Sequence, residues 1–181
     1  MPRYLDFDGL ETYTQQFKPG LAELIDSGAK NIISPVQPTA QSGITITINN
    51  DNSVRVVSDG TNAQAVFNIA TQSTFNMENG TTYVLSGCPN GSSSTFDLRA
   101  SIGGTNYPEY GDGIEFTYNG ESTYGIAIVI RASQSIDVTF KPMVCSKTVW
   151  NISHSYQPYR PSYDEIISTI GDINSVLEEV L

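Results

Sequence analysis

The sequence predicts a mainly β protein, an antiparallel β-sandwich or jelly roll flanked by an N-terminal and a C-terminal helix. Between residues 31 and 148, Thr, Ser, Asn, Gly, Val and Ile dominate, and short strand-like runs are separated by turn signals. No helical periodicity lies between these runs, so the crossover helices that a parallel sheet requires are missing. The flanking residues instead space their apolar side chains by three and four, as helices do.

Residues 1–30 predict a helical attachment segment. Asp8 and Glu11 form a D-x-x-E capping pattern at the start of a helix. The apolar side chains that follow share one helix face, which we expect to attach the chain to a partner: Leu10, Tyr13 and Phe17. Pro19 then kinks or breaks the helix, because the residue before a proline avoids helical geometry.

Residues 31–148 predict the β-sandwich domain, with about eight strands. Ile44–Ile48 alternates strictly between Ile and Thr, which is typical of a half-buried strand. The turn-forming run Asn49–Asn52 joins it to a second strand, Ser53–Val57, as a hairpin. The other runs with strand character are Gln64–Ile69, Thr81–Ser86, Thr95–Ile102, Ile114–Tyr118, Tyr124–Arg131 and Ile136–Val144. This many short strands with turns between them indicates a sandwich or jelly roll.

Two segments follow the sandwich. Residues 149–161 carry Pro158 and Pro161 among tyrosines, so we expect them to lie extended across the sandwich. Residues 162–181 predict a helix that begins with a capping box formed by Ser162 and Glu165. Its apolar side chains follow the spacing of the a and d positions of a coiled coil: Tyr163, Ile166, Ile170, Ile173, Leu177 and Val180.

This C-terminal helix is predicted to mediate oligomerisation. It contains five acids and no base, so it lacks internal ion pairs and needs a packing partner. That partner is the chain's own sandwich, its N-terminal helix or further copies of the same helix. Because isoleucine at d positions favours three or four helices over two, we expect a homotrimer.

The charge balance limits the possible partners. Nineteen acidic and nine basic residues give a formal net charge of −10, which disfavours binding to nucleic acid and to anionic lipid. No run of eighteen apolar residues is available to span a bilayer, and the N-terminus lacks the apolar stretch of a signal peptide. Cys88 and Cys145 lie beside apolar runs and outside any CxxC motif, so we expect buried thiols.

The sequence offers no catalytic or metal site, and we expect neither enzyme activity nor a cofactor. His154 is the only histidine, and no phosphate-binding loop or zinc motif occurs. Asp97 and Glu115 alternate with apolar neighbours inside strands, which predicts that both point outward into solvent. Glu109 and Asp112 lie in a predicted loop, so we expect no carboxylate pair suited to hydrolysis.

Four tyrosines within eighteen residues predict a ligand-binding rim. Exposed aromatic rings can stack on the apolar faces of sugars, and Asn, Gly, Ser and Glu residues lie between them here. The predicted carbohydrate-binding residues are Tyr107, Tyr110, Tyr118 and Tyr124. Tyrosine is equally common in protein interfaces and in half-buried strands, so those interpretations stay open.

The order of several motifs resembles a known family. The opening YLDFDGLETY, followed by AKNIIS, is similar to the N-terminus of phage tail and fibre proteins from viruses of Gram-positive gut bacteria. The segments GITITINNDNSVRV, NGTTYVLSGCPNGSSSTFDLRA and STYGIAIVIRASQSIDVTFKPMV resemble the carbohydrate-binding-module-like jelly roll of such virion proteins. YQPYRPS resembles their closing element.

This resemblance implies a non-enzymatic structural protein of the virion. The chain would be a tail, fibre or decoration component that forms oligomers and contacts other virion proteins. It would be made in the cytoplasm of the host bacterium and end up in the particle. The alternative is a carbohydrate-binding module that contacts glycans of the host surface or of mucus.

Overall fold

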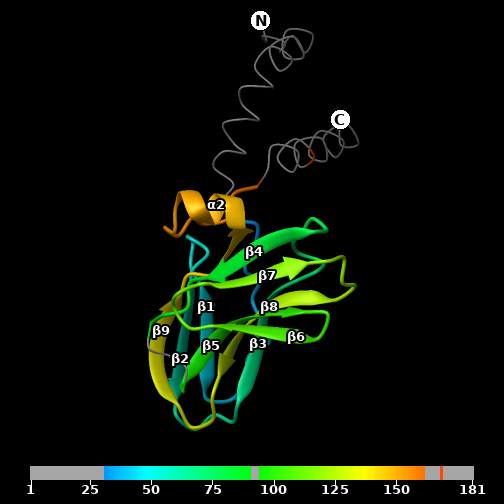
Figure 1. Ribbon diagram of the computed structural model, residues 1–181. Helices are drawn as coiled ribbons and strands as arrows, with labels where there is room; N and C mark the ends of the chain where they lie inside the picture. The colour runs from blue at the N-terminus through cyan, green and yellow to red at the C-terminus, as the bar shows by residue number, and fades with distance from the viewer. Residues whose placement is uncertain (1–30, 91–93, 162–167, 169–181) are drawn as a thin grey trace, which may run out of the picture. The chain divides into compact units, whose positions relative to one another are not determined.

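The computed structural model of the protein describes residues 31–90, 94–161 and 168 (Figure 1). The chain divides into two units, of which one is Lys30–Tyr159. The predicted N-terminal helix, with its attachment residues, lies outside the described residues. The predicted oligomerisation residues of the C-terminal helix also lie outside them. The description below therefore concerns the unit Lys30–Tyr159.

Ten strands and one short helix make up the described part of the chain (Figure 1). The strands are β1 (Ile44–Ile48), β2 (Val54–Asp59), β3 (Ala65–Thr71), β4 (Thr81–Ser86), β5 (Phe96–Ile102), β6 (Thr105–Glu109), β7 (Ile114–Tyr118), β8 (Tyr124–Ile130), β9 (Ser135–Phe140) and β10 (Met143–Ser146). The helix α2 (Lys147–Ile152) follows β10 directly. Every strand pair is antiparallel, which confirms the predicted mainly β, antiparallel class.

The strands form three sheets that share one core. Their orders are β1-β2-β9, β10-β4-β7 and β3-β8-β5-β6. Only Lys141 and Pro142 separate β9 from β10, so one interrupted strand joins the two three-stranded sheets by pairing first with β2 and then with β4. Inward residues of all three sheets belong to a single hydrophobic cluster, the packing expected of a sandwich.

A glycine permits the close backbone contact at this interruption. Gly87, which follows β4, has a φ of 109° and accepts a hydrogen bond from the Lys141 N–H at 2.8 Å. A Cβ atom at Gly87 would lie 1.8 Å from the carbonyl oxygen of Lys141. Glycine is therefore the only residue that fits between the end of β4 and the break in the neighbouring strand.

Three strands have the predicted bounds, namely β1, β4 and β7. The sequence does not predict β6, because Pro108 and Asn106 are poor strand formers. This strand lies at the edge of its sheet, where the missing N–H of a proline need not cost a ladder bond. The predicted single strand Ile136–Val144 is instead split into β9 and β10, with Pro142 in the gap.

The segment predicted as extended begins with helix α2 instead. Ser146 caps this helix by accepting a hydrogen bond from the Val149 N–H at 3.3 Å, and the helix ends at Ile152 with Ser153 as its C-cap. Residues 153–161 have no regular secondary structure, and the Tyr156 hydroxyl donates to the carbonyl oxygen of Asp51 at 2.7 Å. Part of the segment thus lies against the β1–β2 turn. No helix in the described part of the chain is long and apolar enough to cross a membrane.

Candidate functional site

The four tyrosines of the predicted sugar-binding rim do not form an exposed row. The rings of Tyr118 and Tyr124 meet edge to face at 5.2 Å, and both pack against the core. Tyr107 also packs against the core, with its ring centroid 5.7 Å from that of Phe116. Tyr110 differs from them, since 40% of it is exposed. Three of these rings therefore pack against the core, and the four do not form one exposed surface.

Hydrogen bonds hold two of these tyrosines in place. The hydroxyl of Tyr118 donates to the carbonyl oxygen of Glu121 at 3.1 Å. The hydroxyl of Tyr124 donates to the carbonyl oxygen of Phe75 at 3.1 Å, and burial raises the pKa of this tyrosine. Both polar ends are thus directed at backbone oxygens rather than presented to a ligand.

The acids predicted to face solvent have different environments. Glu115 is exposed as predicted, with 55% of its side chain accessible, and forms an ion pair with Lys147. Asp97 lies on the outer face of its sheet but is 0% exposed, so the prediction of a solvated side chain is wrong. The reason is that two arginines enclose its carboxylate.

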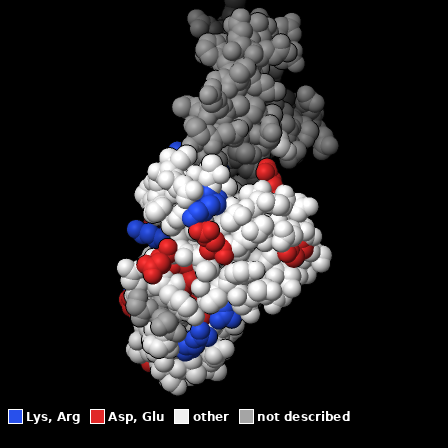
Figure 2. Space-filling model, in the orientation of Figure 1, with Lys and Arg blue, Asp and Glu red and all other residues white. Residues whose placement is uncertain are grey.

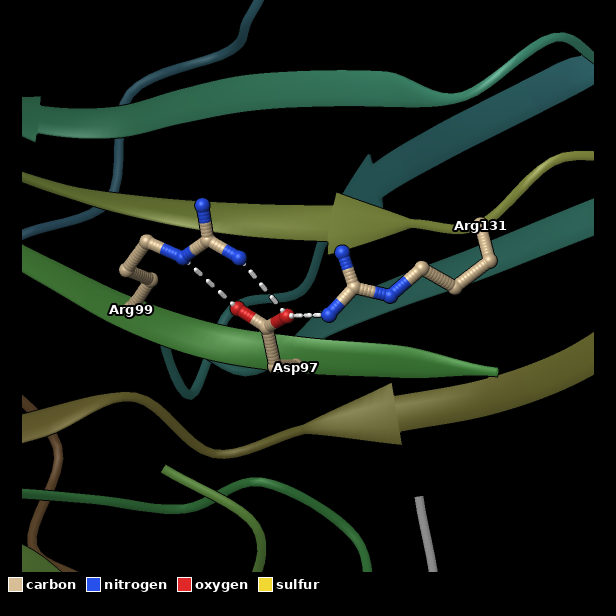
Figure 3. Close-up of polar contacts among 3 residues, drawn as sticks. All are labelled: Asp97, Arg99 and Arg131. Atoms are coloured by element: carbon tan, nitrogen blue, oxygen red, sulfur yellow. Dashed lines mark hydrogen bonds and ion pairs between the residues drawn. The ribbon is translucent and has the colours of Figure 1, made fainter. Parts of the chain in front are cut away.

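Figure 3 shows Arg99 and Arg131 approaching Asp97 from opposite sides. Arg99 makes two parallel contacts: Nε donates to Oδ1 and Nη2 donates to Oδ2, both at 3.0 Å. Arg131 Nη2 donates to the same Oδ2 at 2.5 Å. The arginine side chains are 22% and 28% exposed, so the network separates a buried carboxylate from solvent. Removing one partner of such a buried pair typically costs about 3–5 kcal/mol.

The strand register explains how these three side chains meet. Asp97 and Arg99 are two residues apart in β5, so both project from the same face. Arg131 directly follows β8, whose residue Val129 is paired with Asp97. The alternation within β5 could have indicated the first pair, but the approach of Arg131 depends on the pairing of β5 with β8, which no local pattern reveals.

A hollow of about 400 Å³ lies on the same sheet. Two residues of β8 line it: Gly125, which has no side chain, and Ala127, which has a small one. Ala127 is in register with Asn68 of β3 and with Arg99 of β5, so the arginine lies next to the hollow along this row. The lining is mostly small or uncharged polar: Asn68, Thr71, Gln72, Ser73, Ser101, Thr123, Tyr124, Gly125 and Ala127. We call this hollow and the three-residue ion network the outer-face site.

Glu109 has a structural environment of its own. Its carboxylate is buried and accepts hydrogen bonds from three backbone N–H groups, those of Cys88 at 2.7 Å, Gly113 at 3.0 Å and Gly111. Burial raises the pKa of Glu109, and the three donors act in the opposite direction. The side chain thereby joins the loop after β4 to the loop between β6 and β7. The Glu109 carboxylate therefore has a structural role as a hydrogen-bond acceptor.

A second hollow of about 270 Å³ lies beside helix α2. The rings of Trp150 and His154 stack there at 4.4 Å, and the Lys141 ammonium lies 5.9 Å from the centre of the Tyr156 ring. Cys88 lines this hollow, and both Cys88 and Cys145 are buried, as predicted; no disulfide joins them. Among the described residues, no group of three or more His, Cys, Asp or Glu side chains is placed to hold a metal ion.

No family model and no curated protein matches the sequence. Among solved structures, the chain is similar to the Glycosylation Associate Protein (Gap123) complex from Streptococcus agalactiae, with 20% identity and a TM-score of 0.48. This match covers 66% of the present chain and 44% of the other, so the chain spans less than half of that protein. It is also similar to accessory secretory protein 1, 2 and 3 in Streptococcus pneumoniae, with 15% identity, a TM-score of 0.48, and coverage of 65% and 95%.

These comparisons correct the predicted identity. The prediction of a phage tail, fibre or decoration protein located in the virion is wrong, because the similar structures belong to streptococcal glycosylation-associated and accessory secretory proteins. The alternative of a host-adhesive carbohydrate-binding module is wrong for the same reason, and the coiled-coil homotrimer with virion partners gains no support. Neither similarity transfers an activity or a partner to this chain.

Proposed function

We propose that this chain is a non-catalytic module that binds another protein through the outer face of the sheet β3-β8-β5-β6. The observation that carries the proposal is the outer-face site: a fixed, largely buried ion network next to a hollow on a sheet face. A bidentate arginine–carboxylate pair holds both side chains in one geometry, which favours a preorganised binding surface.

The composition of this face suits a protein partner. Val66 is 48% exposed beside the buried Val129, so an apolar position lies next to the ion network. Aliphatic contact area next to arginine and neutral polar groups is the usual make-up of a protein interface. Uncharged surface also predominates on the side of the molecule that Figure 2 draws, in line with a chain in which only 15% of residues are charged.

The absence of catalysis is part of the same proposal. The two buried carboxylates of the described residues, Asp97 and Glu109, both have structural partners. Asp97 is held by two arginines, and Glu109 is held by three backbone donors. Neither side chain is therefore available to transfer protons to a substrate, as a general acid or base must.

We also propose that the fold is a jelly roll. Joining β9 and β10 as one interrupted strand gives the orders β1-β2-(β9/β10)-β4-β7 and β3-β8-β5-β6. Without the added edge strand β1, these are the two four-stranded sheets that two interlocking Greek keys produce. In this arrangement the proposed docking face is the outer side of one complete sheet.

Site-specific photo-crosslinking tests the function. A photoreactive phenylalanine analogue replaces Asn68 on the docking face or, as the matched control, Thr47 on β1; both residues are exposed. We expect adducts with one defined protein from position 68 only, and a stable complex when that protein is purified and mixed with this chain. No adduct, or equal labelling from both positions, would refute the proposal.

A further inference from the structure

We propose that Arg99 and Arg131 recognise a carboxylate on an acidic segment of the partner protein. This inference rests on the proposed docking face and specifies the chemical group that this face recognises. Two guanidinium groups share a single carboxylate, so the network carries a net charge of +1. It is thus a local positive site on a chain whose formal net charge is −10.

The arginines retain donors after Asp97 is satisfied. Arg99 uses Nε and Nη2, and Arg131 uses Nη2. Figure 3 shows the remaining terminal nitrogen of each guanidinium pointing away from Asp97, and the two point to the same side. A second carboxylate on that side can accept hydrogen bonds from both guanidinium groups, which are the strong, charge-assisted kind.

The surroundings give such a carboxylate room. Arg99 is in register with Ala127, whose short side chain lines the hollow, and with Asn68 beyond it. Asn68 supplies an amide donor within the same row. The side chains of an extended segment can therefore occupy the hollow while one of its acids reaches the arginines.

The long-range charge of the chain does not prevent this contact. Repulsion from distant acids is screened beyond about 8–10 Å at physiological salt. Partly buried arginines are screened much less, so the local attraction dominates once the acid is seated. We therefore expect binding that weakens as salt is added.

An NMR titration of the full chain tests the inference. The probe is a blocked peptide of alternating glutamate and glycine, and the control peptide carries glutamine in place of glutamate. We expect the glutamate peptide alone to shift the amide signals of Gly125 and Ala127 and the Nε–H signals of Arg99 and Arg131. Equal shifts from both peptides, or none from either, would overturn the inference.

Three variants sharpen the test. Arg99→Gln should weaken binding roughly tenfold through the loss of a charge-assisted contact. Asp97→Asn should strengthen it, because the internal carboxylate no longer competes for the arginines; a purely structural network would give no gain. Arg55→Gln removes an exposed ion pair from the opposite sheet and should leave binding unchanged. Weaker binding by Asp97→Asn in a protein with native NMR dispersion would contradict the proposal.

Failure here is distinguishable from failure of the proposed function. Cross-links from position 68 without any response to the glutamate peptide would support protein docking on this face and refute the recognition of a carboxylate there. If a variant fails to fold, the comparison of the two peptides on the unmodified chain decides the question.

Discussion

Gly87→Ala should be among the most damaging single changes in the sandwich. The added Cβ would lie 1.8 Å from the carbonyl oxygen of Lys141, and the backbone φ of 109° is one that side chains rarely adopt. Backbone strain costs about 1–3 kcal/mol and overpacking costs about 1–3 kcal/mol. Loss of the hydrogen bond from the Lys141 N–H costs about 1 kcal/mol more. We expect a loss of about 3–7 kcal/mol from a total that is typically about 5–15 kcal/mol.

Gly80→Ala is the matched control. Gly80 also has a positive φ, 80°, but a Cβ atom there would meet nothing within 4 Å. Its cost should be the conformational term alone, about 1–2 kcal/mol. Urea denaturation followed by circular dichroism measures both variants against the parent. If Gly87→Ala loses no more stability than Gly80→Ala, the close approach of the two backbones does not constrain the fold and the reasoning fails.

Three further predictions follow from single contacts. Asn31→Ala should lower the free energy of unfolding by about 2–3 kcal/mol in urea melts. The reason is that the buried side chain donates to the Pro142 carbonyl and accepts from the Val144 N–H. A loss below that of an exposed-site control such as Thr47→Ala would contradict this prediction. Burial raises the pKa of Tyr156 to about 12, so stability should fall as pH rises from about 10 towards 12, where the unfolded tyrosine ionises first. Absorbance titration at alkaline pH should lose that late transition in Tyr156→Phe, and an unchanged curve would refute it. Cys88 and Cys145 should react with a thiol reagent only after unfolding, and fast labelling of the native protein would count against their burial.

The strands were predictable where local pattern and burial agree. The alternation of Ile44–Ile48 and the turn glycines around β4 and β7 gave correct bounds, because β1 and β7 each have one clear inner face and β4 lies between two glycines. The edge strand β6 was not predicted, because its residues favour turns and only its pairing with β5 makes it a strand. Pro142 divided a run that was uniformly strand-like on either side.

The site was far less predictable than the fold. Asp97 lies on the outward face that alternation assigned to it, yet it is buried because Arg99 of β5 and Arg131, just after β8, cover it. Which strand lies next to β5 depends on the whole topology, and so does the identity of the covering residue Arg131. The packing of Tyr107, Tyr118 and Tyr124 was not predictable for a related reason: spacing along the chain does not reveal which rings will pack against the core.

The interrupted strand has a consequence for aggregation. A break in a ladder usually exposes backbone groups that an incoming chain can pair with. Here the Lys141 N–H is bonded to Gly87, and the Asn31 side chain bonds the Pro142 carbonyl and the Val144 N–H. The seam between the two three-stranded sheets thus offers no template for intermolecular β-pairing, and a single buried asparagine protects much of it.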